Sequence, residues 1–128
     1  MFRSLQFQPR IITIFCKDAS NHRATNIINY LKPFETAKKL DIEIHDQFPT
    51  REQLQYMSQI DSKLLNKQIN NLNTLLKLRP HEPPFNESIK DAINQGVWNH
   101  EDGTLWVDWE KQKMGDSLKS IESEIKET

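Results

Sequence analysis

A run of six residues with apolar side chains on both of its alternating faces, residues 11–16 (IITIFC), constrains the fold of this chain more than any other feature. β-Branched and aromatic side chains favour a strand, and a strand without a polar face has to be covered on both sides. The run therefore predicts a central strand in a sheet with helices on both faces.

The residues that follow predict a helix and a second strand. N-cap residue types are concentrated in residues 18–21. Apolar residues at helical spacing come next: Ala24, Ile27, Ile28 and Leu31. Pro33 is expected to close this helix or to follow its end closely. Residues 40–45 then alternate between apolar and polar, as in a strand with one wet face, so the segment makes a right-handed βαβ unit with parallel strands.

Two helices are expected next. Thr50 and Gln53 fit a capping box at the start of the first one. The second is predicted to begin near Asp61 and to carry one apolar stripe: Leu65, Ile69, Leu72 and Leu76. Three prolines in residues 79–84 predict a rigid loop, because proline disfavours both a helix interior and a central strand.

The last part of the chain predicts a helix, a hairpin and a closing helix. Asn86 is expected to cap the first of these helices, and Gly96 to take the left-handed position at its end. Residues 105–109 alternate cleanly between the two faces of a strand. Leu105, Val107 and Trp109 share one face, and Trp106 and Asp108 lie on the other. Trp106 belongs to the core if helices cover both faces, and is an anchor for a ligand or partner if they do not.

The order of these elements, a βαβ half followed by helices and then a ββα half, predicts a thioredoxin-like three-layer α/β/α sandwich with inserted helices between the halves. We expect one domain over residues 1–128, with residues 1–10 as an N-terminal arm. The strand at 11–16 should lie at the centre of the sheet, parallel to 40–45 and antiparallel to 105–109.

Composition argues against several classes of function. There are 17 Lys and Arg residues against 18 Asp and Glu, a net charge of −1, so no basic stripe for a nucleic-acid partner is expected. The apolar stretches are too short for a membrane span. Three glycines are too few for a dinucleotide fingerprint, and four scattered histidines lack the spacing of metal ligands. We therefore expect no resident cofactor and no metal. The absence of a large apolar surface stripe argues against a tight obligate partner, so a monomer is expected.

Thiol chemistry depends on Cys16, the only cysteine. The reactive sulfur of a thioredoxin fold lies at the start of the first helix, where the helix dipole stabilises a thiolate. Ser20 occupies that place here, and we expect it to act as an N-cap. Cys16 ends the apolar first strand, which predicts a buried, slowly reacting thiol. If Lys17 and His22 bring positive charge to it, Cys16 is instead catalytic by a monothiol route, with glutathione as co-substrate.

Two segments, residues 48–57 (FPTREQLQYM) and 105–110 (LWVDWE), together with residues 96–99 (GVWN), resemble a family of small fungal mitochondrial proteins. A redox function and a thioredoxin-like fold are ascribed to that family, and the resemblance covers nearly the whole chain from about Phe2. It implies a mitochondrial oxidoreductase that acts on small molecules or thiols. Alignment on residues 96–99 puts the family's suggested redox cysteine at Ala92, whose methyl group has no redox state.

Three functions remain open at this point. The first is a mitochondrial oxidoreductase that uses Cys16, and the second is a thioredoxin-fold binding module without catalysis. The third is binding of a small thiol or anion around Ser20, without turnover. The basic, acid-free residues 1–10 also resemble a short mitochondrial targeting segment, so we expect a mitochondrial localisation.

Overall fold

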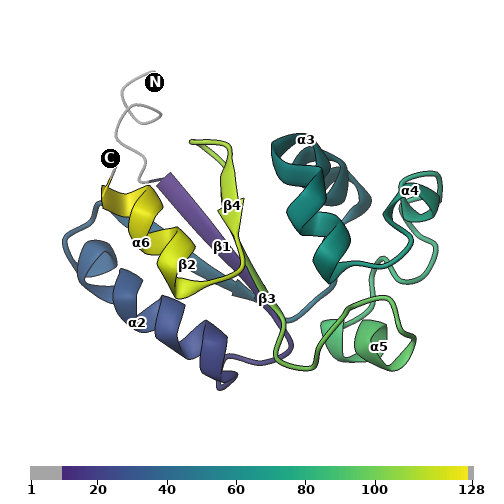
Figure 1. Ribbon diagram of the computed structural model, residues 1–128, viewed down its shortest axis with the longest axis horizontal. Coiled ribbons are helices and arrows are strands. Elements are labelled where there is room, and N and C mark those ends of the chain that lie inside the picture. The colour runs from purple at the N-terminus through teal and green to yellow at the C-terminus, as the bar shows by residue number, and fades with distance from the viewer. Residues whose placement is uncertain (1–9, 127–128) are drawn as a thin grey trace.

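A four-stranded sheet forms the centre of the structure, a computed structural model that describes residues 10–126 (Figure 1). Its strands are β1 (Arg10–Cys16), β2 (Leu40–His45), β3 (Thr104–Asp108) and β4 (Lys113–Gly115), in the order β2-β1-β3-β4. β1 runs parallel to β2, with Ile12 opposite Ile42, and antiparallel to β3, with Ile12 opposite Asp108. The predicted arrangement of these three strands is confirmed.

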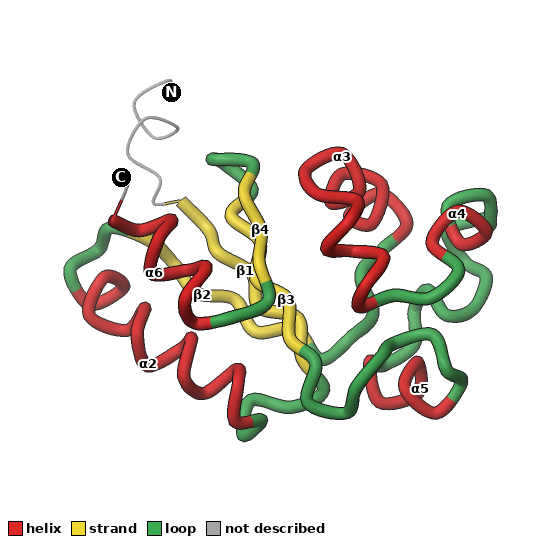
Figure 2. Tube along the Cα trace, in the orientation of Figure 1, coloured by secondary structure: helices red, strands yellow, loops and turns green. Residues whose placement is uncertain are grey.

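Helices cover both faces of this sheet (Figures 1 and 2). One face carries α2 (His22–Thr36) and α6 (Leu118–Lys126), and the other carries α3 (Arg51–Gln68), α4 (Leu72–Leu75) and α5 (Ile89–Asn94). The predicted mixed α/β architecture, with helices inserted between its two halves, is confirmed. No helix within residues 10–126 is both long enough and apolar enough to cross a bilayer.

Each face of the sheet has its own core. The core on the side of α2 and α6 contains Ile12, Ile14, Cys16, Ala24, Ile27, Leu31, Leu40, Trp106, Ile121 and Ile125. On the opposite side, Phe15, Leu105 and Val107 pack with α3, α4 and α5. Trp106 is only 1% exposed. Of the two roles open to Trp106 from the sequence, the structure confirms the one in the core.

Helix α2 continues further than its sequence predicts. The expectation that Pro33 closes the helix is wrong, because the helix runs on to Thr36. Phe34 packs against the α2 and α6 core, and its ring centroid lies 5.7 Å from that of Tyr30. Partial burial of this ring helps to stabilise the residues after the proline in the helix, so packing outweighs the local preference.

The last turn of α2 also contacts the edge of the sheet. The Glu35 carboxylate accepts a hydrogen bond of 3.1 Å from the backbone N–H of Ile42 in β2. β2 is an edge strand, and its apolar side chains are covered unevenly: Leu40 is buried, whereas Ile44 is 44% exposed.

The capping box predicted for α3 is confirmed. Thr50 Oγ1 accepts from the backbone N–H of Gln53 at 3.1 Å, and Gln53 Oε1 accepts from the N–H of Thr50 at 2.9 Å. The helix has a kink at Asp61, where φ is −157° and ψ is 86°. Asp61 Oδ1 accepts from the N–H of Leu64 at 3.1 Å, and so caps a second helical segment as the sequence suggests.

The continuous apolar stripe predicted after this kink is interrupted. The stripe does not form one helix, because α3 ends before Ile69 and α4 begins after Asn71. Ile69 forms an isolated bridge with Trp98. The N–H of Asn70 donates to the carbonyl of Val97 at 2.8 Å, and Asn71 has a left-handed φ of 60°. Pairing with a distant segment therefore breaks a helix that the spacing alone favours.

Helix α5 begins later than expected. Ser88 is its N-cap, with Oγ accepting from the N–H of Asp91 at 3.0 Å. Asn86 does not cap the helix: its φ is 71°, whereas an N-cap residue takes an extended conformation. Gly96 has a φ of 77° just after the helix, as predicted.

The first described residue, Arg10, belongs to β1 and not to the N-terminal arm, so the strand begins one residue earlier than expected. Its Nε lies 3.2 Å from Oδ2 of Asp108, a side chain with no solvent exposure. The other carboxylate oxygen, Asp108 Oδ1, accepts from the N–H of Lys111 at 3.1 Å. The rest of the predicted arm, residues 1–9, lies outside the described residues.

Candidate functional site

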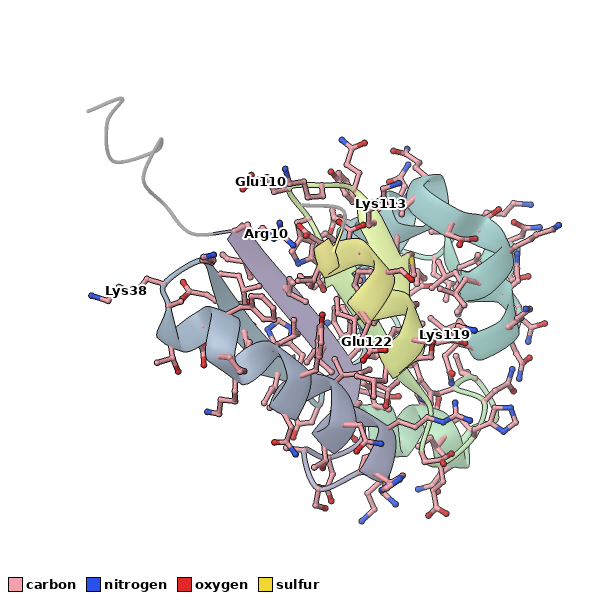
Figure 3. The ribbon with its side chains drawn as sticks, turned by 60° about the vertical axis from the view of Figure 1, so that its left-hand side comes forward. Arg10, Lys38, Glu110, Lys113, Lys119 and Glu122 are labelled. Atoms are coloured by element: carbon pink, nitrogen blue, oxygen red, sulfur yellow. The ribbon has the colours of Figure 1, made fainter. Side chains whose placement is uncertain are left out.

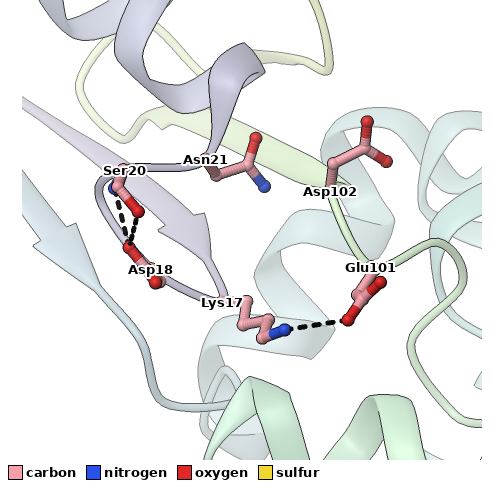
Figure 4. Close-up of a pocket in the computed structure, with 6 residues that line it drawn as sticks. All are labelled: Lys17, Asp18, Ser20, Asn21, Glu101 and Asp102. Atoms are coloured by element: carbon pink, nitrogen blue, oxygen red, sulfur yellow. Dashed lines mark hydrogen bonds and ion pairs between the residues drawn. The ribbon is translucent and has the colours of Figure 1, made fainter.

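The carboxyl end of β1 is the place where a thioredoxin-like chain would carry its chemistry. The loop between β1 and α2 faces the loop that precedes β3, and the two enclose an open pocket of about 200 Å³ (Figure 4). The pocket is lined by Lys17, Asp18, Ser20, Asn21, Glu101 and Asp102. It therefore includes the loop that the sequence singles out, together with a segment that the sequence does not connect with it.

The backbone donors at the start of α2 are already used. Asn21 is the N-cap, and its Oδ1 accepts from the N–H groups of Arg23 and Ala24 at 2.9 and 3.5 Å. Ser20 is not the N-cap that we expected, because its hydroxyl donates to Asp18 at 2.6 Å. These contacts leave the helix terminus with less capacity to bind a thiolate or another anion, the third of the alternatives drawn from the sequence.

The charges around the pocket do not favour an anion either. Lys17 Nζ lies 3.0 Å from Oε1 of Glu101, and Arg23 Nε lies 4.0 Å from Oδ2 of Asp102. Hydrogen bonds from the Ser20 side chain and backbone lower the pKa of Asp18, so this carboxyl stays ionised at neutral pH. The lining carboxylates outnumber the lining lysine, and the surface is suited to a polar or cationic contact.

Cys16 lies directly before this loop, and its predicted burial is confirmed. Its side chain is 0% exposed and belongs to the core under α2 and α6. Burial raises the pKa of the Cys16 thiol to about 11, and the nearby carboxylates of Asp18 and Asp46 also raise it, against a lowering hydrogen bond from the Asp18 backbone. The thiol is therefore protonated at neutral pH.

Lys17 and His22, the basic residues that could have brought positive charge to Cys16, make their contacts with other side chains. The Lys17 ammonium pairs with Glu101, and His22 is exposed, with Nε2 at 3.5 Å from the Asn26 side-chain amide. Neither side chain offsets the effect of burial on the thiol. The electrostatic condition for a reactive Cys16 is thus not met in this conformation.

Ala92, the position of the family's suggested redox cysteine, lies in α5 on the other side of the sheet. It is 0% exposed and packs in the core under α3, α4 and α5. Its carbonyl accepts from the N–H groups of Val97 and Trp98 at 2.9 and 3.1 Å. Cys16 and Ala92 belong to different cores, so the two positions could not form one redox pair even if both carried sulfur.

The histidines are dispersed. His22, His81 and His100 are exposed, and His45 is half-buried with its ring centroid 5.4 Å from that of Phe15. Across residues 10–126, no three His, Cys, Asp or Glu side chains converge in a way that could hold a metal ion.

Comparisons with known proteins identify the family. Residues 2–117 match the family described as "Protein of unknown function (DUF1687)". Proteins of Candida glabrata and Saccharomyces cerevisiae, both named "Putative redox protein FMP46, mitochondrial", are 42% and 34% identical to this chain. The first match covers 94% of this chain and 93% of the relative, and the second covers 97% and 95%.

A solved structure extends this similarity to three dimensions. The solution NMR structure of protein YKR049C from Saccharomyces cerevisiae matches with a TM-score of 0.54 at 33% sequence identity, over 95% of this chain and 93% of that one. The names of the curated relatives place the family in mitochondria, in agreement with the localisation expected from the sequence. The chain belongs to the DUF1687 family, and it belongs to one family with these fungal mitochondrial proteins.

Proposed function

We propose that this protein takes part in the redox function of its mitochondrial family as a thioredoxin-like binding module, and that it does not turn over through a thiol of its own. The main support for this proposal is the burial of Cys16, the only thiol of the chain. Cys16 is 0% exposed with a pKa of about 11, and the family's suggested redox position is Ala92. Neither the thioether of a methionine nor the methyl group of Ala92 can form a disulfide, so Cys16 is the only residue of the chain whose sulfur could form one.

The topology supports a thioredoxin-like assignment. A βαβ half is followed by a ββα half, and the sheet has the order β2-β1-β3-β4 with β3 antiparallel to β1. Because β1 and β3 are antiparallel neighbours, the loop after β1 and the loop before β3 meet at the same end of the two strands. This end of the sheet carries the polar pocket lined by Lys17, Asp18 and Glu101, where a small polar or cationic molecule, or a protonated thiol of a partner, would bind without being oxidised or reduced.

One observation favours a second candidate, a monothiol oxidoreductase. Cys16 is adjacent in sequence to Lys17, which lines the pocket, and its sulfur would reach the surface if this end of β1 left its place opposite Thr104. The Cys16 thiolate would attack a mixed disulfide between glutathione and a substrate, forming a bond to the glutathione sulfur and releasing the substrate thiolate. A second glutathione thiolate would then release Cys16 and form glutathione disulfide.

Alkylation of the native protein distinguishes these two functions. With a pKa of about 11, only about one Cys16 in ten thousand is a thiolate at pH 7, so iodoacetamide should label the folded protein very slowly. The labelling rate should rise as the pH approaches 11, because the thiolate fraction increases. Protein unfolded in urea is the control and should be labelled rapidly at the same pH. Rapid labelling of native protein at neutral pH would instead favour the monothiol enzyme.

Substitution of Cys16 provides the matching test of activity. Cys16→Ser should lower the free energy of unfolding by about 1–3 kcal/mol, because it places a hydroxyl in an apolar core, and Cys16→Ala should cost less. A glutathione-linked disulfide reductase assay should give the same background rate for the wild type and for Cys16→Ala. A glutathione-dependent activity that disappears in Cys16→Ala would contradict the binding-module proposal.

The targeting segment proposed for the N-terminal arm lies outside the described residues and requires a test in cells. A fluorescent fusion that lacks residues 1–8 should fail to enter mitochondria, because the basic and aromatic residues of the segment are removed. The full-length fusion is the control. Import of the shortened fusion at the level of the control would show that the signal lies elsewhere in the chain.

A further inference from the structure

A second pocket lies at the opposite end of β1, far from the loop that follows Cys16. Its volume is about 270 Å³, and the described residues that line it are Arg10, Phe34, Lys39, Leu40, Lys111 and Ile125. Arg10 begins β1, and Cys16 ends it. This pocket is therefore independent of the surface considered in the proposed function.

The described lining is basic on one side and apolar on the other. Three of these side chains, Arg10, Lys39 and Lys111, are cationic, and none is acidic. The chain as a whole has a net charge of −1, so this concentration of positive charge is local. The remaining lining residues, Phe34, Leu40 and Ile125, give the pocket an apolar wall.

A buried carboxylate holds two of the three cationic residues in place. Asp108 has no solvent exposure, and its Oδ2 lies 3.2 Å from Nε of Arg10, whose side chain is 12% exposed. Oδ1 of Asp108 accepts from the backbone N–H of Lys111 at 3.1 Å. One carboxylate thus fixes both the guanidinium and the turn that carries the second cation, so part of the binding geometry is preorganised.

The Arg10 guanidinium retains unused hydrogen-bonding capacity. Within the described residues, its buried Nε and Nη2 both lack a hydrogen-bond partner, so Asp108 holds the guanidinium as an ion pair and not through a hydrogen bond. An arginine presents its N–H groups in a planar fork that matches a carboxylate or a phosphate, whereas lysines contribute mobile point charges. The combination of one anchored arginine with two lysines is typical of sites that bind small oxyanions.

We propose that this pocket binds a small organic anion, in which a carboxylate or phosphate group is attached to a short apolar body. The anionic group would contact Arg10, Lys39 and Lys111, and the apolar body would pack against Phe34, Leu40 and Ile125. A volume of about 270 Å³ admits a ligand of a few carbon atoms together with its charged group. The same chemistry could come from a free metabolite or from the headgroup region of an anionic lipid.

Two pairs of charge reversals test the proposal on the full chain. Lys39→Glu and Lys111→Glu change exposed side chains that line the pocket. Lys38→Glu and Lys90→Glu are the controls, because they change exposed lysines that do not line it: Lys38 is next to Lys39 in sequence, and Lys90 lies in α5 on the other face of the sheet. Figure 3 shows Lys38 extending away from the molecule. Amide chemical shifts are recorded during titration with inorganic phosphate and with hexanoate, and the same proteins are sedimented with vesicles of phosphatidylcholine and phosphatidylglycerol.

The expected result is saturable binding, with chemical-shift changes concentrated around Arg10, Leu40 and Lys111. Each of the two pocket variants should weaken the apparent affinity about tenfold, while the two controls leave it nearly unchanged. Saturable binding of hexanoate or phosphate identifies a free anion as the ligand. Binding to vesicles alone, with the same dependence on Lys39 and Lys111, identifies a lipid headgroup.

Three results would overturn the proposal. The first is an absence of saturable binding to all of these probes. The second is an equal loss of affinity in the pocket variants and the control variants, which would indicate nonspecific attraction by surface charge. The third is a set of chemical-shift changes concentrated at Ser20 and Asn21, which would place the anion at the other end of the sheet.

Discussion

Replacing Asp108 with alanine should lower the free energy of unfolding by about 3–5 kcal/mol, because it leaves an arginine buried without its carboxylate. The Asp108 side chain has no solvent exposure, and that of Arg10 is only 12% exposed. Water in the pocket that Arg10 lines can reach only part of this guanidinium, so it replaces the missing carboxylate incompletely. The same substitution removes the acceptor for the Lys111 N–H, so the turn between β3 and β4 also loses an anchor. Urea denaturation followed by circular dichroism measures the change.

Two further variants separate this effect from the general loss of an acidic residue. Asp41→Ala removes an exposed aspartate from β2 and should change stability by no more than about 0.5 kcal/mol. The double variant Arg10→Met, Asp108→Leu removes both buried charges, and should recover much of the loss because apolar side chains tolerate burial. If Asp108→Ala destabilised the protein no more than Asp41→Ala, the ion pair would not be important for folding.

Replacing Trp106 with alanine should cost about 3–5 kcal/mol, since it leaves a large cavity between the sheet and the two helices on that face. Trp106 is 1% exposed, and its Nε1 donates to Oγ of Ser120 at 2.8 Å. Gly115 lies so close that a Cβ added there would be 2.6 Å from Nε1 of the tryptophan, which shows how closely the indole is enclosed. Urea denaturation followed by far-ultraviolet circular dichroism avoids the change in fluorescence.

Two milder substitutions apportion this loss between packing and hydrogen bonding. Trp106→Phe keeps a ring in the core and should cost clearly less than Trp106→Ala. Ser120→Ala keeps the whole indole but removes its acceptor, for a loss of about 1 kcal/mol. Equal destabilisation by all three variants would mean that the hydrogen bond, and not the volume of the indole, determines the stability of this core.

The sheet could be predicted from the sequence because strand alternation is a local property. Residues 11–16 are apolar on both faces, and the structure covers both faces. Residues 105–109 alternate, and the structure separates Trp106 from Leu105 and Val107 into different cores. In both segments, the faces that the pattern of apolar side chains predicts to be buried are buried. The capping box of Thr50 and Gln53 was predictable for the same reason, since its two residues are neighbours in sequence.

Two of the incorrect predictions, those for the ends of helices near Ile69 and Pro33, have a common physical cause, which is tertiary packing. The stripe through Ile69 would form one helix if it were isolated, but Trp98 and Val97 pair with this segment and end the helix. Likewise, Pro33 would end α2 if Phe34 had no core to enter. Local propensity amounts to a fraction of a kcal/mol per residue for most side chains, but to about 3 kcal/mol for a proline inside a helix. The cost of Pro33 is offset by two contacts together, that of the Phe34 ring with the core and that of Glu35 with β2.

Of the two loops that form the candidate site, only the one after β1 could be predicted from the sequence. The burial of Cys16 followed from its place on an apolar strand, and the polar loop after it could be located. The opposite wall could not, because Glu101 is 84 positions away from Lys17, with which it pairs. No local signal connects these two residues. The partnership of Arg10 and Asp108 was hidden for the same reason, since only the pairing of β1 with β3 brings them together.

The contact between Glu35 and the edge of β2 has a consequence for how the protein behaves at high concentration. An edge strand presents unpaired backbone groups that can recruit a strand from another molecule, which is the first step towards fibrils. Glu35 already occupies the N–H of Ile42, one of the donors that an incoming strand would need. The exposed carboxylates of Asp41 and Glu43 would also repel a second copy of the same strand. The exposed Ile44 therefore lies on an edge that is protected against fibril growth, and the protein can tolerate an apolar side chain there.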